Sequence, residues 1–317
     1  MSARRTWKLA VALAFYALLV AFLVRYLRGT DWGMLARLDV EWRFLLLALP
    51  WSLAPRFVQP IAWRVLIDGY GEKAPPYPQL TRVYALSWLG RYIPGKVAWV
   101  GAKVLFGRDH GVNAGTLAAT AVAEAILHLS TALALALLLS AFWTEAVWLG
   151  PGVALLAAVS LAMLSVAILP PVFNRVMALA SARLSRAAPA GAGRLRGRSL
   201  VTAAAMYAAI HALSGIPVYL ILRALSPALD WSLVPELTAA ILLAGTLGTL
   251  AVFAPAGLGV REGILIVALG ALMPKSVAVA GVVVLRLWSL AIDLLYYMLA
   301  AALARVAPGA GGQSFRG

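Results

Sequence analysis

Three uncharged apolar runs constrain the fold of this chain more than any other feature. They cover residues 146–169, 199–222 and 237–260, and none of them contains Asp, Glu, Lys or Arg. At about 1.5 Å of rise per residue, each run is long enough to cross a hydrocarbon core of roughly 30 Å as an α-helix. A helix on the surface of a soluble domain would interleave polar residues at helical spacing, and these runs do not. The sequence therefore predicts an all-α polytopic membrane protein.

The composition agrees, with 63% hydrophobic and 12% charged residues. The net charge of +15 comes from cations near segment ends, where Lys and Arg set membrane orientation and meet anionic headgroups. There is no interleaved aromatic and basic pattern, so we expect no nucleic acid partner. The chain has no Cys, and its three His have no metal-ligand spacing, so we expect no disulfide, metal or cofactor.

The apolar pattern predicts about six to eight transmembrane helices. We place long helices at residues 7–27, 42–67, 114–142, 146–170, 199–224, 236–253 and 276–304. Pro50, Pro55 and Pro60 should kink or split the second of these helices. The first begins with an apolar run that is either a signal peptide or an uncleaved helix, and the lack of a cleavage site favours the helix.

Two further segments are interrupted and too short to span. Residues 79–107 form two helical pieces divided at Pro94-Gly95, and a break at 255–262 precedes a short piece at 263–272. Broken backbone at membrane depth is tolerated where protein or a water-filled cavity surrounds it, which predicts re-entrant segments. Because each half of the chain contains one, we expect an internal, inverted repeat.

Basic residues predict the orientation. The loop at 174–198 holds six Arg and no acidic residue, which is typical of a cytoplasmic loop. The basic N-terminus would lie on the same side if 79–107 enters and leaves the membrane on one face. We therefore expect one domain over 1–307, with halves 1–173 and 199–307 and a disordered tail at 308–317, in the cell membrane.

The first break carries a candidate anion site. Arg91 precedes Pro94-Gly95, and Lys96 and Lys103 lie seven residues apart on one helical face. A helix that begins near Gly95 would point its free amides at an anion, and Lys96 would add a full charge. The alternative is that all three cations extend to the headgroup layer.

The second break carries the other candidate. Gly257 and Gly259 follow Pro255 and allow close backbone approach, and Arg261-Glu262 comes directly after them. Arg261 is suited to bidentate phosphate binding, with Glu262 as its partner in the empty state. The alternative is an ion pair that only closes a loop.

Three more charged residues lie within predicted helices. Glu124, with His128 one turn later on the same face, should face the bundle interior and either carry a proton or pair with a cation. Arg286 and Asp293 share a face but are about 10 Å apart along the axis, so each should meet a partner on another helix. Arg286 and Asp293 each belong either to the anion site or to a structural contact with another helix. Arg56 is a weaker candidate.

These motifs resemble a known family. Arg-Tyr-Ile-Pro-Gly-Lys-Val-Ala-Trp at 91–99, Glu124, and Pro-Ala-Gly-Leu-Gly-Val-Arg-Glu at 255–262 are similar to the lysylphosphatidylglycerol synthase transmembrane, or flippase-like, family. The resemblance implies a bundle with re-entrant elements that moves a lipid headgroup between leaflets. We expect a stand-alone member without the aminoacyltransferase domain of two-domain relatives. Many members have Gly-Glu where this chain has Ala98 and Trp99.

We therefore expect a transporter rather than an enzyme. The leading hypothesis is a translocase for an anionic phospholipid, glycolipid or polyprenyl-phosphate-linked headgroup, with membrane lipids as partners. One alternative is a non-catalytic partner of a lipid-modifying glycosyltransferase or synthase. Another is a membrane-embedded lipid-phosphate transferase or hydrolase, although the sequence contains no evident nucleophile and base pair.

Overall fold

The computed structural model describes residues 40–92, 98–141, 155, 159, 162, 169–175, 194–251 and 257–306. These residues form nine α-helices and no β-strand, which confirms the all-α prediction. Five segments are long and apolar enough to cross a membrane: Trp42–Gly69, Ala114–Ala141, Gly197–Leu225, Trp231–Leu250 and Lys275–Val306. The helices predicted at 7–27 and 146–170 and the tail at 308–317 fall wholly or mostly outside the described residues.

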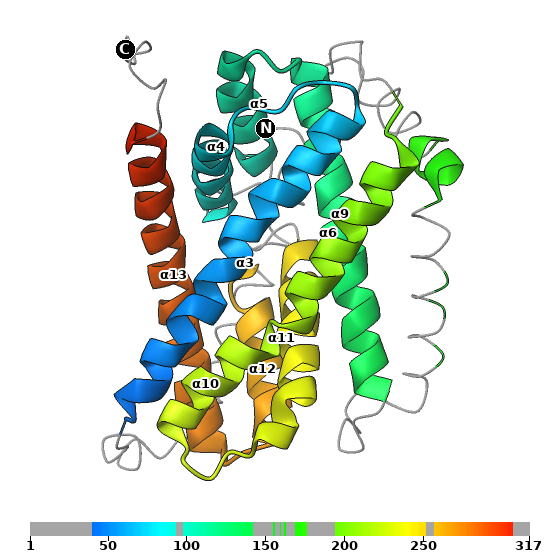
Figure 1. Cartoon of the computed structure of the whole chain (residues 1–317). Helices are drawn as coiled ribbons and strands as arrows, with labels where there is room; N and C mark the ends of the chain where they lie inside the picture. The colour runs from blue at the N-terminus through cyan, green and yellow to red at the C-terminus, as the bar shows by residue number, and fades with distance from the viewer. Residues whose placement is uncertain are drawn as a thin grey trace, which may run out of the picture.

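Helix α3 (Trp42–Gly69) runs obliquely across the near side of the bundle in Figure 1. It packs against α6 (Ala114–Ala141), α9 (Gly197–Ala212) and α10 (Gly215–Leu225). The second half of α3 buries large apolar side chains such as Trp63, Leu66 and Ile67. Its first half exposes apolar side chains that lipid would cover. Because α3 packs against α6 of the first half and against α9 and α10 of the second half, it joins the two halves of the chain.

The three prolines do not split α3, so that part of the prediction is wrong. Pro50, Pro55 and Pro60 all lie inside one continuous helix. Each proline removes one backbone hydrogen bond and costs about 3 kcal/mol in an exposed helix. In a membrane bundle, neighbouring helices and side chains offset this cost, and the low-dielectric surroundings penalise a fully unwound backbone more strongly.

The helix predicted at 199–224 is interrupted, which the sequence analysis did not anticipate. Helix α9 ends at Ala212, a turn follows at Leu213 and Ser214, and α10 begins at Gly215. Pro217 lacks an N–H, and its ring would clash with the carbonyl of Leu213 in a continuous helix. The Ser214 hydroxyl donates to the His211 carbonyl at 2.7 Å, which satisfies a backbone acceptor at the break.

Short helices flank the two predicted breaks. Helices α4 (Tyr77–Leu89) and α5 (Ala98–Gly107) confirm two short helical pieces within 79–107. Helix α12 (Val260–Gly270) packs against α11 (Val234–Leu250) and α13 (Lys275–Val306). Figure 1 shows α4 and α5 at one end of the bundle and α12 at the other end.

The two halves of the sequence interleave rather than stand apart. Helix α6 packs against α9 and α11, and α4 packs against α13. Apolar clusters draw side chains from both halves, for example around Trp63, Tyr84 and Tyr296. Any site at the centre of this bundle is therefore built from both halves of the chain.

A close contact between α10 and α11 provides a test of the packing. A Cβ at Gly215 would lie 2.6 Å from the Val234 carbonyl oxygen and 2.0 Å from Thr238 Oγ1. We expect Gly215→Leu to lower the free energy of unfolding by about 1–3 kcal/mol, because the helices must move apart. Thermal unfolding in detergent micelles measures this.

The matched control is Gly101→Ala in α5. A Cβ at Gly101 meets nothing within 4 Å. This change should leave stability equal or raise it by up to about 1 kcal/mol, since Ala is the better helix former. Equal unfolding midpoints for Gly215→Leu and the native chain would contradict the close packing.

Candidate functional site

A cavity of about 370 Å³ lies inside the bundle, where several helices begin, end or break. Its walls come from α3, α4, α5, α6, α9, α10, α11, α12 and α13. Most of the lining is apolar, with Trp51, Trp88, Trp99 and Trp288 among the side chains. Cavities of this size and lining are typical of small-molecule sites, where a few polar groups set specificity. The charged lining residues are Arg56, Arg91, Glu124 and Arg261.

One buried carboxylate holds two arginines on one wall. Asp293 of α13 is 1% exposed and forms ion pairs with Arg56 of α3, at 3.0 Å, and with Arg91. It also accepts hydrogen bonds from the Tyr92 hydroxyl at 2.7 Å and from Trp88 Nε1 at 3.2 Å. The partners of Asp293 thus lie on other helices, as expected from its distance to Arg286. One carboxylate cannot neutralise two guanidinium groups, so one positive charge remains here.

The two guanidinium groups stack on one indole ring, that of Trp88. The Arg56 and Arg91 guanidinium carbons lie 4.7 Å and 4.8 Å from the centroid of the Trp88 ring. Stacking of this kind stabilises a cation by about 0.5–2 kcal/mol and fixes its orientation. Trp88 therefore fixes the orientation of both arginines on the cavity wall. Its indole N–H donates to Asp293, the carboxylate that both arginines bind.

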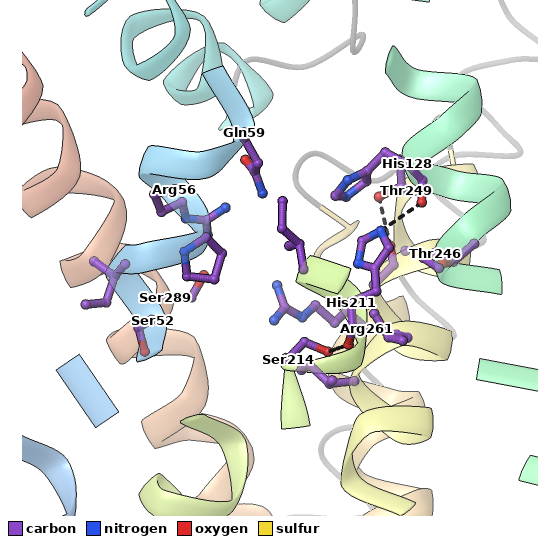
Figure 2. Close-up of a pocket in the computed structure, with 18 of the residues that line it drawn as sticks. Ser52, Arg56, Gln59, His128, His211, Ser214, Thr246, Thr249, Arg261 and Ser289 are labelled. Atoms are coloured by element: carbon purple, nitrogen blue, oxygen red, sulfur yellow. Dashed lines mark hydrogen bonds between the residues drawn. The ribbon is translucent and has the colours of Figure 1, made fainter. Parts of the chain in front are cut away.

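Arg261 reaches the cavity from another side. It is the second residue of α12, and Figure 2 shows it on the side of His128 and His211, across from Arg56 and Ser289. In the part of the chain that the structure describes, no carboxylate lies within ion-pair distance of Arg261. Arg91, Arg286 and Arg56 are close enough to repel its charge, and Glu262, which pairs with Arg286, is close enough to attract it. Arg261 thus carries a second positive charge that has no ion-pair partner of its own among the described residues.

The predicted pairing of Arg261 with Glu262 is wrong. Glu262 accepts a hydrogen bond from the Gly259 backbone N–H at 2.5 Å and lies 3.6 Å from Arg286. Adjacent residues of a helix point about 100° apart, so Glu262 turns back to cap α12 while Arg261 faces the cavity. Gly259 has φ 83°, a left-handed conformation that glycine adopts without strain.

Lys103 and Glu124 form a buried ion pair beside the cavity. Lys103 is 1% exposed, and its Nζ lies 4.1 Å from the Tyr84 ring centroid and 4.5 Å from that of Trp63. The Tyr84 hydroxyl donates to Glu124 Oε1 at 2.7 Å. Lys103 is not among the cavity-lining residues. The structure therefore brings Lys103 to Glu124, as in the ion-pair alternative for Glu124, rather than to the cavity wall.

Two histidines meet on the wall formed by α6 and α9. The ring centroids of His128 and His211 are 4.6 Å apart, and both line the cavity. His211 Nε2 lies 3.1 Å from the His128 carbonyl oxygen, and because a carbonyl only accepts, His211 donates from Nε2. The sequence analysis missed this pair, since the two residues are 83 positions apart.

The remaining predicted residues divide between described and undescribed positions. Gly257 lines the cavity with φ 69°. Arg286 pairs with Glu262 and is not among the lining residues. Pro94, Gly95, Lys96 and Pro255 lie outside the described residues. Within the described part of the chain, no group of three or more His, Asp or Glu could hold a metal ion.

Arg56 is a more prominent site residue than the sequence analysis suggested. It lies in the middle of an apolar, proline-rich span, and a charge at that depth normally faces a cavity or a partner. That signal was present in the sequence. Trp88 and His211 gave no comparable signal, because aromatic residues and lone histidines are common in apolar helices.

These features define a class: a multi-pass α-helical membrane protein with an arginine-lined internal cavity. The chain belongs to the lysylphosphatidylglycerol synthase TM region family, which it matches over residues 7–313. This confirms the resemblance and links the chain to phospholipids. No curated protein matches the chain.

The buried ion pair gives a double-mutant test. We expect Lys103→Met to lower the free energy of unfolding by about 3–5 kcal/mol, because Glu124 is left buried without a cation. Adding Glu124→Gln should recover part of that loss, because no isolated charge remains. Unfolding in mixed micelles with increasing sodium dodecyl sulfate measures Lys103→Met, Glu124→Gln and the double variant. If the two single effects simply add, the pair is not coupled as the structure indicates.

Proposed function

We propose that this protein is a lipid translocase that carries a phosphate-bearing headgroup through the membrane while the tail stays in lipid. The observation that supports the proposal most directly is the cavity, which is lined by Arg56, Arg91 and Arg261, and only the first two of these arginines pair with the buried Asp293. An enzyme of the same shape would need a nucleophile held beside a base. The lining serines Ser52, Ser214 and Ser289 bond instead to Trp288, to the His211 carbonyl and to Arg91.

Moving a charged headgroup through hydrocarbon costs free energy that the protein must offset. An isolated phosphate would lose its hydration there, and the penalty is far larger than the thermal energy. Arg56, Arg91 and Arg261 offer fixed donors that replace water with charge-assisted hydrogen bonds. The buried Asp293 keeps the first two in place when no headgroup is bound.

The surrounding breaks favour an access path. The α9–α10 break contributes His211 and Ser214 to the cavity lining. Gly257, just before α12, and Arg261, in its first turn, also line the cavity. Short helices approach from both ends of the bundle (Figure 1). Interrupted helices near the membrane midplane are the usual building plan of transporter sites. We propose that 79–107 and 255–272 are re-entrant and alternately open the cavity to the two leaflets.

The proposed function is tested by reconstitution. Purified protein enters liposomes that carry fluorescent anionic lipids, and a membrane-impermeant quencher reports leaflet exchange. We expect exchange with the native protein and a roughly ten- to hundredfold slower rate with Arg261→Ala, since a lost charge-assisted hydrogen bond costs about 1.5–3 kcal/mol.

The matched control is Arg64→Ala. Arg64 is also on α3 but is half exposed and pairs with Asp68 at 3.6 Å, away from the cavity. Its loss should leave the rate unchanged. No exchange of any anionic or polyprenyl lipid by the folded native protein would overturn the proposal in favour of a partner of a lipid-modifying enzyme.

A further inference from the structure

We propose that the cavity is matched to a headgroup with two negative charges, a phosphate monoester or a diphosphate, rather than to a singly charged phosphodiester. The proposal names a substrate class for the cavity and so rests on the proposed function. It follows from the charges that the described residues place around the cavity and from where those charges lie.

The positive and negative charges around the cavity do not balance. The described charged residues that line the cavity, together with their ion-pair partners, comprise four cations and two carboxylates: Arg56, Arg91, Lys103, Arg261, Glu124 and Asp293. The neighbouring pair of Arg286 and Glu262 is neutral and changes nothing. Among the described residues, the charges around the cavity therefore sum to an excess of two positive charges.

The excess positive charge lies on two opposite walls of the cavity. Lys103 and Glu124 neutralise each other in a buried pair, so the excess lies elsewhere. One charge is shared by Arg56 and Arg91 around Asp293, and the other belongs to Arg261 across the cavity (Figure 2). A single negative charge placed between these walls would leave one cation uncompensated in surroundings where unpaired charge is costly.

The number of acceptor oxygens on the headgroup also favours a phosphate monoester or a diphosphate. A phosphate monoester has three terminal oxygens and a charge of about −1.5 to −2 at pH 7, whereas a diester has two such oxygens and one charge. Three guanidinium groups can each meet an oxygen of a monoester or diphosphate. Ser52 and Ser289 also line the cavity and already accept bonds, from Trp288 and Arg91, so each still has a hydroxyl hydrogen to donate.

The cavity volume allows more than one phosphate group. A cavity of about 370 Å³ is larger than one phosphate group, which occupies the room of only a few water molecules at about 30 Å³ each. The remaining volume can hold a second phosphate or the polar group attached to it. The apolar lining from Trp51, Val218 and Trp288 suits the start of a lipid chain.

The test measures binding separately from transport. Calorimetry on the full chain in detergent, at about pH 8, compares dihexanoyl phosphatidic acid with dihexanoyl phosphatidylglycerol. We expect the monoester to bind at least tenfold more tightly. Arg261→Gln should reduce the preference to near one, because it removes one of the two excess charges. Arg64→Gln should keep the native preference.

The outcomes separate this proposal from the translocase proposal. Equal affinity of the native protein for both lipids would overturn the charge match, even if leaflet exchange occurs, and this comparison needs no variant to fold. Selective binding without leaflet exchange would support the charge match and overturn transport. Glycerol 3-phosphate binding as tightly as dihexanoyl phosphatidic acid would support the doubly charged site while assigning it to a soluble ester instead of a lipid.

Discussion

The arrangement of the bundle depends on one buried carboxylate. Asp293 of α13 binds Arg56 of α3 and Arg91 after α4, so it ties together helices from both halves of the chain. A lone aspartate or arginine at this depth would be costly, and the three stabilise one another. Because the pairing is unequal, the same contact that stabilises the fold also leaves positive charge facing a cavity. Stability and site chemistry therefore come from the same residues.

The interruptions in the helices serve the cavity rather than the spans. The α9–α10 break places His211 and Ser214 on the cavity lining, and the start of α12 directs Arg261 toward the same cavity. By contrast, the three prolines of α3 lie inside a helix that stays continuous. A proline in the sequence therefore indicates a break only where neighbouring backbone groups find other partners, as Ser214 provides for His211.

Much of the fold could be predicted from the sequence, because long uncharged runs have one stable arrangement in lipid. The charged candidates could also be recognised, since charge within an apolar run needs an explanation. The pairings could not be predicted. Glu262 lies beside Arg261 in sequence but binds Arg286, and Lys103 turns from the expected anion site to Glu124. These choices depend on side-chain direction and on contacts between residues far apart in the chain, which periodicity does not encode.

Because Arg56 and Arg91 share Asp293, their charges are paired only late in the synthesis of the chain. Synthesis proceeds from the N-terminus, so α3 and Arg91 are complete before α13 exists. During that interval Arg56 has no carboxylate partner from α13, and an arginine at the centre of a membrane helix costs about 2.5–3.5 kcal/mol on insertion scales. This cost favours early helices that stay near the interface or within the insertion machinery until α13 arrives. The arrival of α13 then supplies the carboxylate that allows Arg56 and Arg91 to remain in the membrane interior.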